Sequence, residues 1–62
     1  MGSKLIKVTD TTADLSNLIG MSVKYAEHSD WYKFGGVAND LFIILDRNGN
    51  ELIKTNVIYI KG

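Results

Sequence analysis

The first pattern along the chain is a strict alternation of apolar and polar residues, which is typical of strands with one buried face. It occurs in residues 4–9, where Ile6 and Val8 lie on one face and Lys7 on the other, and again in residues 21–26. We expect a half-buried strand in each segment. The residues predicted to face the core from the second strand are Met21, Val23 and Tyr25.

Between these two strands the spacing of apolar residues changes to that of a helix. Leu15, Leu18 and Ile19 recur at i, i+3 and i+4, the positions that share one helical face. A helix this short is marginal by itself, so we expect at most one short helical turn from Leu15 to Ile19. The candidate end residues are Thr12 or Asp14 at the start and Gly20 at the finish.

The strongest local signal lies in residues 41–53, where two apolar runs flank the dipeptide Asn48-Gly49. Asn and Gly tolerate positive φ at both central positions of a type I′ turn, whose twist matches that of a hairpin. The pattern therefore predicts a tight hairpin with Leu45 opposite Leu52. The pairs predicted nearer the turn are Arg47 with Asn50 and Asp46 with Glu51.

Two further strands follow from the pattern. Residues 31–34 form a short aromatic strand, which Gly35 and Gly36 are expected to end. Residues 54–61 continue the second hairpin strand, and Thr55-Asn56 is the point where a bulge or a tight turn is expected to interrupt it.

The apolar run at residues 41–45 decides the predicted fold class. Its two faces are Phe42 with Ile44, and Leu41 with Ile43 and Leu45. A strand that is apolar on both faces needs cover on both sides, and closing a sheet into a barrel supplies that cover while removing edges. We therefore predict an all-β fold, in which residues 1–62 form a single small antiparallel barrel of about five short strands.

The order of strand, turn-rich excursion, hairpin and final short strand resembles the SH3-like group of small barrels. The likeness is to an architecture and not to a family motif. A curved antiparallel sheet, covered by the helical turn at residues 15–19 or by a second subunit, is the alternative.

Composition narrows the class of protein. A domain of 62 residues is expected to keep only about 3–5 kcal/mol of net stability, so self-association is a plausible further source. The absence of cysteine suits a reducing compartment and predicts a cytoplasmic location. Six lysines among seven basic residues, with frequent Ile and Asn, suggest an AT-rich genome and a bacterial or phage origin.

The chemistry that catalysis requires is mostly missing. His28, Ser29 and Asp30 are consecutive, whereas a hydrolase triad places its histidine between two partners from separate parts of a fold. Residues 46–51 superficially match a calcium loop, but their glycine is fourth rather than sixth. No catalytic residue, cofactor or metal site is predicted, and the protein is expected not to be an enzyme.

Interaction with another macromolecule is the function that remains. Strand alternation places Trp31 and Lys33 on one face and Tyr32 and Phe34 on the other, so one aromatic face fills the core and the other stays at the surface. Exposed Trp or Tyr is a common anchor of protein interfaces. The predicted protein-binding residues are Tyr25, Trp31, Tyr32, Lys33 and Phe34.

On this interpretation the protein is a small accessory or regulatory module that binds a protein partner or itself. Trp31→Ala is then expected to weaken partner binding by about 2 kcal/mol or more, unless Trp31 is simply a core residue. The alternative is a single-stranded nucleic-acid binder that uses the same aromatics with Lys24, Lys33 and Lys54. Zero net charge argues against dedicated DNA binding, and an enzymatic site would need groups supplied across an oligomer interface.

Overall fold

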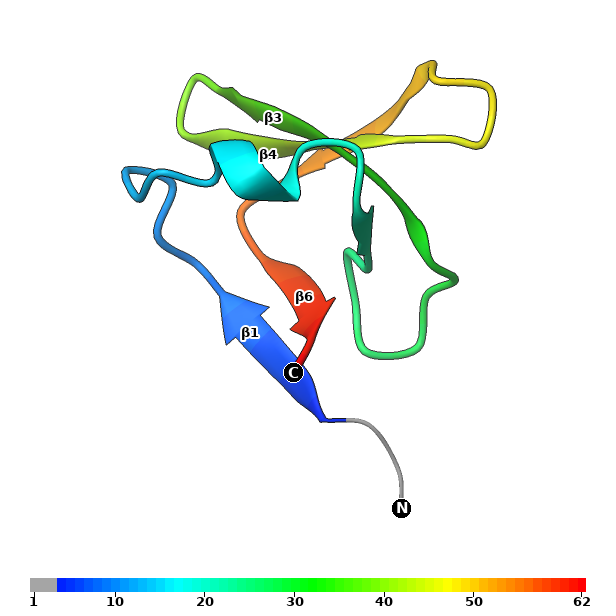
Figure 1. Cartoon of the computed structure of the whole chain (residues 1–62). Helices are drawn as coiled ribbons and strands as arrows, with labels where there is room; N and C mark the ends of the chain where they lie inside the picture. The colour runs from blue at the N-terminus through cyan, green and yellow to red at the C-terminus, as the bar shows by residue number, and fades with distance from the viewer. Residues whose placement is uncertain (1–3) are drawn as a thin grey trace.

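The protein is all-β, and every strand pair is antiparallel. A computed structural model describes residues 4–62, so positions 1–3 of the predicted domain lie outside the described residues. The elements are β1 (Leu5–Val8), the 3₁₀ turn η1 (Ser16–Leu18), β2 (Ser22–Val23), β3 (Tyr32–Ala38), β4 (Leu41–Leu45), β5 (Glu51–Thr55) and β6 (Ile58–Lys61). β1 and β6 form one sheet, and β2, β3, β4 and β5 form the other in that order (Figure 1).

The first strand and the helical turn lie where the sequence predicts them. β1 falls within residues 4–9, and η1 is a single turn within residues 15–19. The Asp14 carboxylate accepts hydrogen bonds from the Ser16 backbone N–H at 3.2 Å and from the Ser16 hydroxyl at 2.8 Å. Gly20, with a φ of +88°, then reverses the chain as glycine commonly does after a helical turn.

The strand predicted over residues 21–26 is shorter than expected. β2 contains two residues and is followed by an isolated bridge between Lys24 and Tyr59. Val23 is fully buried and Tyr25 packs against the core, as predicted. Met21 is 56% exposed, so its predicted inward orientation is wrong; it directly follows the reversal at Gly20 and precedes the strand.

The two glycines expected to end the aromatic strand lie inside it. The register between β3 and β4 slips between Phe34 and Gly36, which is the signature of a β-bulge. Gly36 has a φ of +119°, which side chains other than glycine rarely adopt. At Gly35 a Cβ atom would lie 2.8 Å from Leu45 Cγ, because the leucine side chain lies directly over the glycine backbone.

The type I′ geometry occurs at the turn between β3 and β4, not at the predicted one. Asn39 and Asp40 have φ values of +54° and +62°, and the residues that flank them, Ala38 and Leu41, pair directly. A two-residue loop with positive φ at both positions is what a type I′ turn requires.

The turn between β4 and β5 is wider than the predicted two-residue turn. Of the Asn48-Gly49 pair only Gly49 has a positive φ, +86°. The Asp46 carboxylate accepts hydrogen bonds from the N–H groups of Asn48 at 2.8 Å and Asn50 at 2.9 Å. The Asp46 side chain thereby holds the loop in a form that local residue preference did not predict.

This wider turn also changes the register of the hairpin. Leu45 pairs with Glu51, and Ile44 pairs with Ile53, so the predicted pairing of Leu45 with Leu52 is wrong. An extra residue on β5 is left between the two pairs, as in a bulge. Leu52 and Ile53 remain 45% and 38% exposed on this edge strand.

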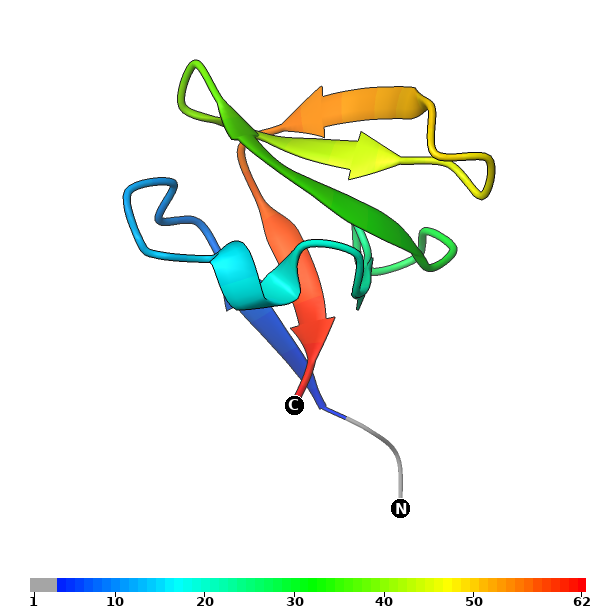
Figure 2. The same ribbon diagram turned by 45° about the horizontal axis from the view of Figure 1, so that its top comes forward.

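The chain changes sheets at the predicted interruption. Strand β5 ends at Thr55 and β6 begins at Ile58, and the Thr55 hydroxyl accepts a hydrogen bond from the Val57 N–H at 3.4 Å. The sheets meet where Lys24 and Tyr59 each donate an N–H to the other's carbonyl at 2.9 Å. Within residues 4–62, β1 and β5 do not pair, so the two sheets do not form a closed barrel (Figures 1 and 2).

The core lies between the two sheets. Its five members are each 0% exposed: Val23, Phe34, Phe42, Ile44 and Ile58. They come from β2, β3, β4 and β6, and the Phe34 and Phe42 rings lie 6.1 Å apart between centroids. Of the two apolar faces predicted for β4, the one with Phe42 and Ile44 is fully buried in the core, while the opposite face is half-buried.

Candidate interaction surfaces

The five residues that the sequence predicts for protein binding separate into two groups in the structure. Tyr25 and Tyr32 stack on each other, with ring centroids 5.9 Å apart and an interplanar angle of 21°. Both are half-buried and pack against the core. Phe34 is fully buried, so it is not an exposed anchor; its place in β3 directs its ring between the two sheets.

Trp31 and Lys33 remain at the surface. Trp31 is half-buried and lies outside the core cluster. Two ammonium groups lie against its ring, with Lys24 Nζ at 4.9 Å and Lys61 Nζ at 5.5 Å from the centroid, within the range of cation–π attraction. Lys33 is exposed, and its register partners on the two neighbouring strands are Ser22 and Leu45.

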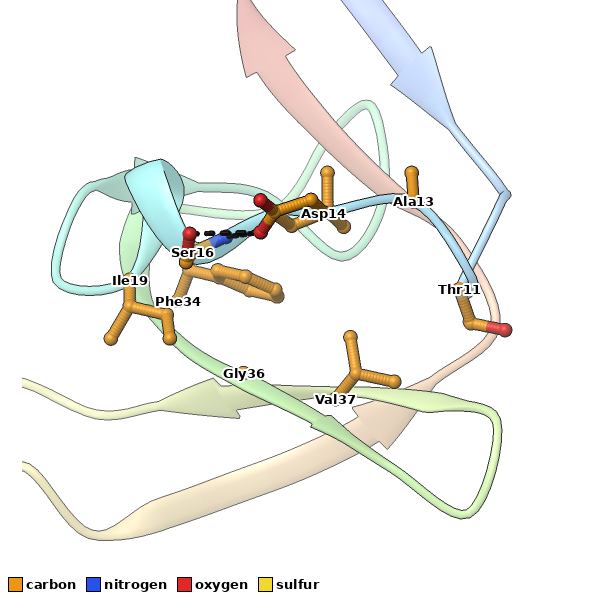
Figure 3. A pocket seen from close by; sticks show the side chains of 9 residues that line it. Thr11, Ala13, Asp14, Ser16, Ile19, Phe34, Gly36 and Val37 are labelled. Atoms are coloured by element: carbon orange, nitrogen blue, oxygen red, sulfur yellow. Dashed lines mark hydrogen bonds between the residues drawn. The ribbon is translucent and has the colours of Figure 1, made fainter.

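A pocket of about 190 Å³ lies elsewhere, between the loop that leads into η1 and strand β3 (Figure 3). We call it the η1 pocket; it is lined by Thr11, Ala13, Asp14, Leu15, Ser16, Ile19, Phe34, Gly36 and Val37. Sequence reasoning did not identify this pocket, because its walls come from segments that the fold alone brings together.

The walls of the η1 pocket are mainly apolar. The Phe34 ring lies between the loop and β3, and Val37 points from β3 toward the loop (Figure 3). Ile19 is 56% exposed and Val37 is 39% exposed, so the mouth of the pocket presents aliphatic side chains to solvent. The bulge at Gly36 leaves room here, since a Cβ atom at that position would meet only Ile19 Cδ1, at 3.9 Å.

A carboxylate lies at the rim of this apolar pocket. The Ser16 hydroxyl and N–H that bond to Asp14 lower the pKa of that carboxyl below its ordinary value of 3.8. On the same loop, the Thr12 hydroxyl and N–H lower the pKa of Asp10. Both groups are therefore ionised at neutral pH, and Asp14, which lines the η1 pocket, adds negative charge to its apolar walls.

His28, Ser29 and Asp30, the residue types of a hydrolase triad, lie next to one another in the turn region between β2 and β3. The Ser29 hydroxyl donates a hydrogen bond to the carbonyl oxygen of Asp30 at 3.0 Å. Among residues 4–62, no group of three or more His, Asp or Glu side chains is arranged to hold a metal ion. The same residues contain no helix that is long and apolar enough to cross a membrane.

No protein-family model matches the chain, no curated protein matches its sequence, and no solved structure matches its fold.

Proposed function

We propose that this protein is a non-enzymatic interaction module that docks on a protein partner through the η1 pocket. The observation that carries the proposal is an apolar pocket with exposed Ile19 and Val37 at its mouth. Interfaces commonly concentrate their binding energy where an apolar side chain enters such a pocket. The contact surface thus differs from the predicted aromatic one, since Phe34 contributes a buried wall rather than an anchor.

The size of the pocket favours a single side chain as its occupant. Its volume of about 190 Å³ is below the roughly 300–1,000 Å³ of typical small-molecule sites. One aliphatic or thioether side chain of a partner would remove Ile19 and Val37 from water, and the burial of apolar area stabilises such a contact.

The charge at the rim suggests what should flank that side chain. Asp14, which lines the pocket, accepts hydrogen bonds from the Ser16 N–H and hydroxyl that favour its ionised form. A lysine or arginine next to the apolar residue would face this carboxylate. The partner is therefore a protein segment that carries an apolar residue beside a basic one.

For the architecture, we propose an SH3-like barrel that is open between β1 and β5. The meander of β3, β4 and β5 and the return of β6 to pair with β1 support this relationship. A cytoplasmic location in a bacterium or phage-infected cell, proposed from the cysteine-free, lysine-rich composition, is compatible with a small regulatory module.

The test is selection from a phage-displayed library of random dodecapeptides, followed by calorimetric titration of synthetic peptides. We expect selected peptides to share an apolar residue beside Lys or Arg. Ile19→Asp should weaken binding by about 30-fold or more, which corresponds to about 2 kcal/mol. The matched control is Leu52→Asp, which changes a similarly exposed residue on β5, 45% exposed, away from the pocket.

Circular dichroism establishes that both variants are folded before affinities are compared. Amide resonances of Gly36 and Val37 should shift when the peptide is added to the wild-type protein. The proposal is rejected if the library yields no shared motif, or if selected peptides bind the Ile19→Asp variant as tightly as the wild type.

A further inference from the structure

Pairing of the first and last strands creates a second surface, which the sequence order does not reveal. In the β1–β6 register Lys7 lies opposite Tyr59, and the isolated bridge places Lys24 opposite Tyr59 on the other side. Residues directly opposite each other in antiparallel strands project from the same face. Lys7, Tyr59 and Lys24 therefore form a line across the sheet.

Trp31 extends this line by one position. The β2–β3 register pairs Ser22 with Lys33 and Val23 with Tyr32, so the next position in the same register places Trp31 opposite Lys24. The distance of 4.9 Å between Lys24 Nζ and the Trp31 ring centroid agrees with that placement.

Lys61 completes the surface. It lies two residues after Tyr59, on the same face of β6, and its Nζ is 5.5 Å from the Trp31 ring centroid. We call this surface the lysine–aromatic row; it consists of Lys7, Tyr59, Lys24, Trp31 and Lys61. The opposite face of the same strands contributes Ile58 and Val23 to the core, so the row faces outward.

The three lysines of the row have no carboxylate partner within 4.0 Å in the described part of the chain, where the one ion pair joins Lys54 to Glu51. Lys24 Nζ contacts the backbone carbonyl of Glu27 at 3.3 Å, which neutralises no charge. Glu27 and Asp30 are the acidic residues of the adjoining loop. The zero net charge of the protein thus coexists with a local excess of positive charge beside two aromatic rings.

We propose that the lysine–aromatic row binds single-stranded nucleic acid. Phosphates would accept hydrogen bonds from the three ammonium groups, and unpaired bases would stack on Trp31 and Tyr59, the combination that single-strand binding surfaces use. A single strand is favoured over a duplex because its bases are free to stack. Of the three lysines predicted for such a role from the sequence, Lys24 belongs to the row, whereas Lys33 lies on β3 outside it and Lys54 lies on β5.

The first measurement is a titration of the wild-type protein with a fluorescein-labelled thymidine dodecamer, followed by anisotropy. Three phosphate contacts predict a slope of log K against log salt of about −2, at about −0.7 per phosphate in single strands. The chain contains one tryptophan, so quenching of its fluorescence by the unlabelled dodecamer reports stacking on Trp31 without any mutation.

Two charge-reversal variants test whether binding depends on the lysine–aromatic row or only on the overall charge of the protein. Lys61→Glu should weaken dodecamer binding at least about tenfold, while Lys54→Glu, the same charge change on β5, should alter it less than about twofold. A duplex of the same length and a hexaglutamate peptide serve as competitors, and both should compete poorly.

Three results would overturn the proposal. One is no binding of the dodecamer at 50 mM salt. Another is equal loss of affinity in the Lys61→Glu and Lys54→Glu variants. The third is equal competition by hexaglutamate, which would identify the row as a site for acidic protein segments. Because the row and the η1 pocket share no residue, failure here leaves the docking proposal unaffected.

Discussion

The substitution Gly35→Ala tests the packing of the Leu45 side chain over the bulge in β3. The backbone at Gly35 lies outside the left-handed region, so alanine meets no conformational penalty there. Its Cβ would instead lie 2.8 Å from Leu45 Cγ, 3.0 Å from Leu45 Cδ2 and 3.2 Å from Ile43 Cγ2. Because Leu45 Cγ is the branch point of its side chain, it cannot move aside without a change of rotamer or of backbone.

Two opposing effects determine how much Gly35→Ala changes the free energy of unfolding. Overpacking of this kind costs about 1–3 kcal/mol, whereas replacing glycine by alanine restricts the unfolded chain and contributes about 0.4–1 kcal/mol of stability. The net expectation is a loss of about 1–2 kcal/mol in the free energy of unfolding. For a domain of this size, that lowers Tm by about 4–16 °C.

Urea and thermal unfolding, followed by circular dichroism, measure this loss. A Leu45→Ala background provides the internal control, because removing the leucine Cγ removes the closest contact of the new Cβ. The cost of Gly35→Ala should be at least about 0.5 kcal/mol smaller in that background, as for residues in direct contact. A Gly35→Ala protein as stable as the wild type, or equal costs in both backgrounds, would refute the packing described here.

Two further predictions concern the loops. Asp40→Gly should raise Tm, because Asp40 has a φ of +62° in a two-residue turn and glycine, the preferred second residue of a type I′ turn, adopts that conformation without the steric cost of a Cβ atom; an unchanged or lower Tm would contradict this. Because hydrogen bonds from Ser16 lower the pKa of Asp14 below 3.8 in the folded state, their stabilisation is present above that pH and is lost on acidification. The stability difference between wild type and Ser16→Ala should therefore shrink from neutral pH to below 3.8, and a constant difference in urea unfolding would argue against it.

The residues of the candidate interaction surface around Trp31 could be predicted only in part from the sequence. Alternation placed Trp31 and Lys33 on one face and Phe34 on the other, but it did not decide that the face with Phe34 fills the core. The neighbours of Trp31 could not be predicted. Lys61 lies 30 positions away in the sequence, and it reaches the Trp31 ring only because β6 returns to the centre of the fold.

The η1 pocket could not be predicted from local sequence preferences either. One of its walls comes from β3 at Phe34, Gly36 and Val37, where the Gly35-Gly36 pair is by local preference the signal for the end of a strand. Glycine is compatible with a terminus, a turn or a bulge, and the choice depends on the side chains across the sheet. Here the Leu45 side chain lies over Gly35, and Gly36 has a positive φ.

The sequence by itself determined the local elements whose cause lies within a few residues. The alternation around Val8, the spacing of Leu15 and Leu18, and the break at Thr55 each predicted an element that the structure contains. Such features follow from side-chain periodicity and backbone preference, which act over short separations along the chain.

Only the tertiary structure decided the registers, the path through the glycines and the meeting of the two sheets. The β4–β5 register places Leu45 opposite Glu51 rather than Leu52, and the bridge between Lys24 and Tyr59 joined segments 35 residues apart. These choices depend on contacts between strands, whose energies are gained only after the chain has closed long loops. Both candidate surfaces lie where such distant segments meet, and for that reason neither could be assembled in full from the sequence.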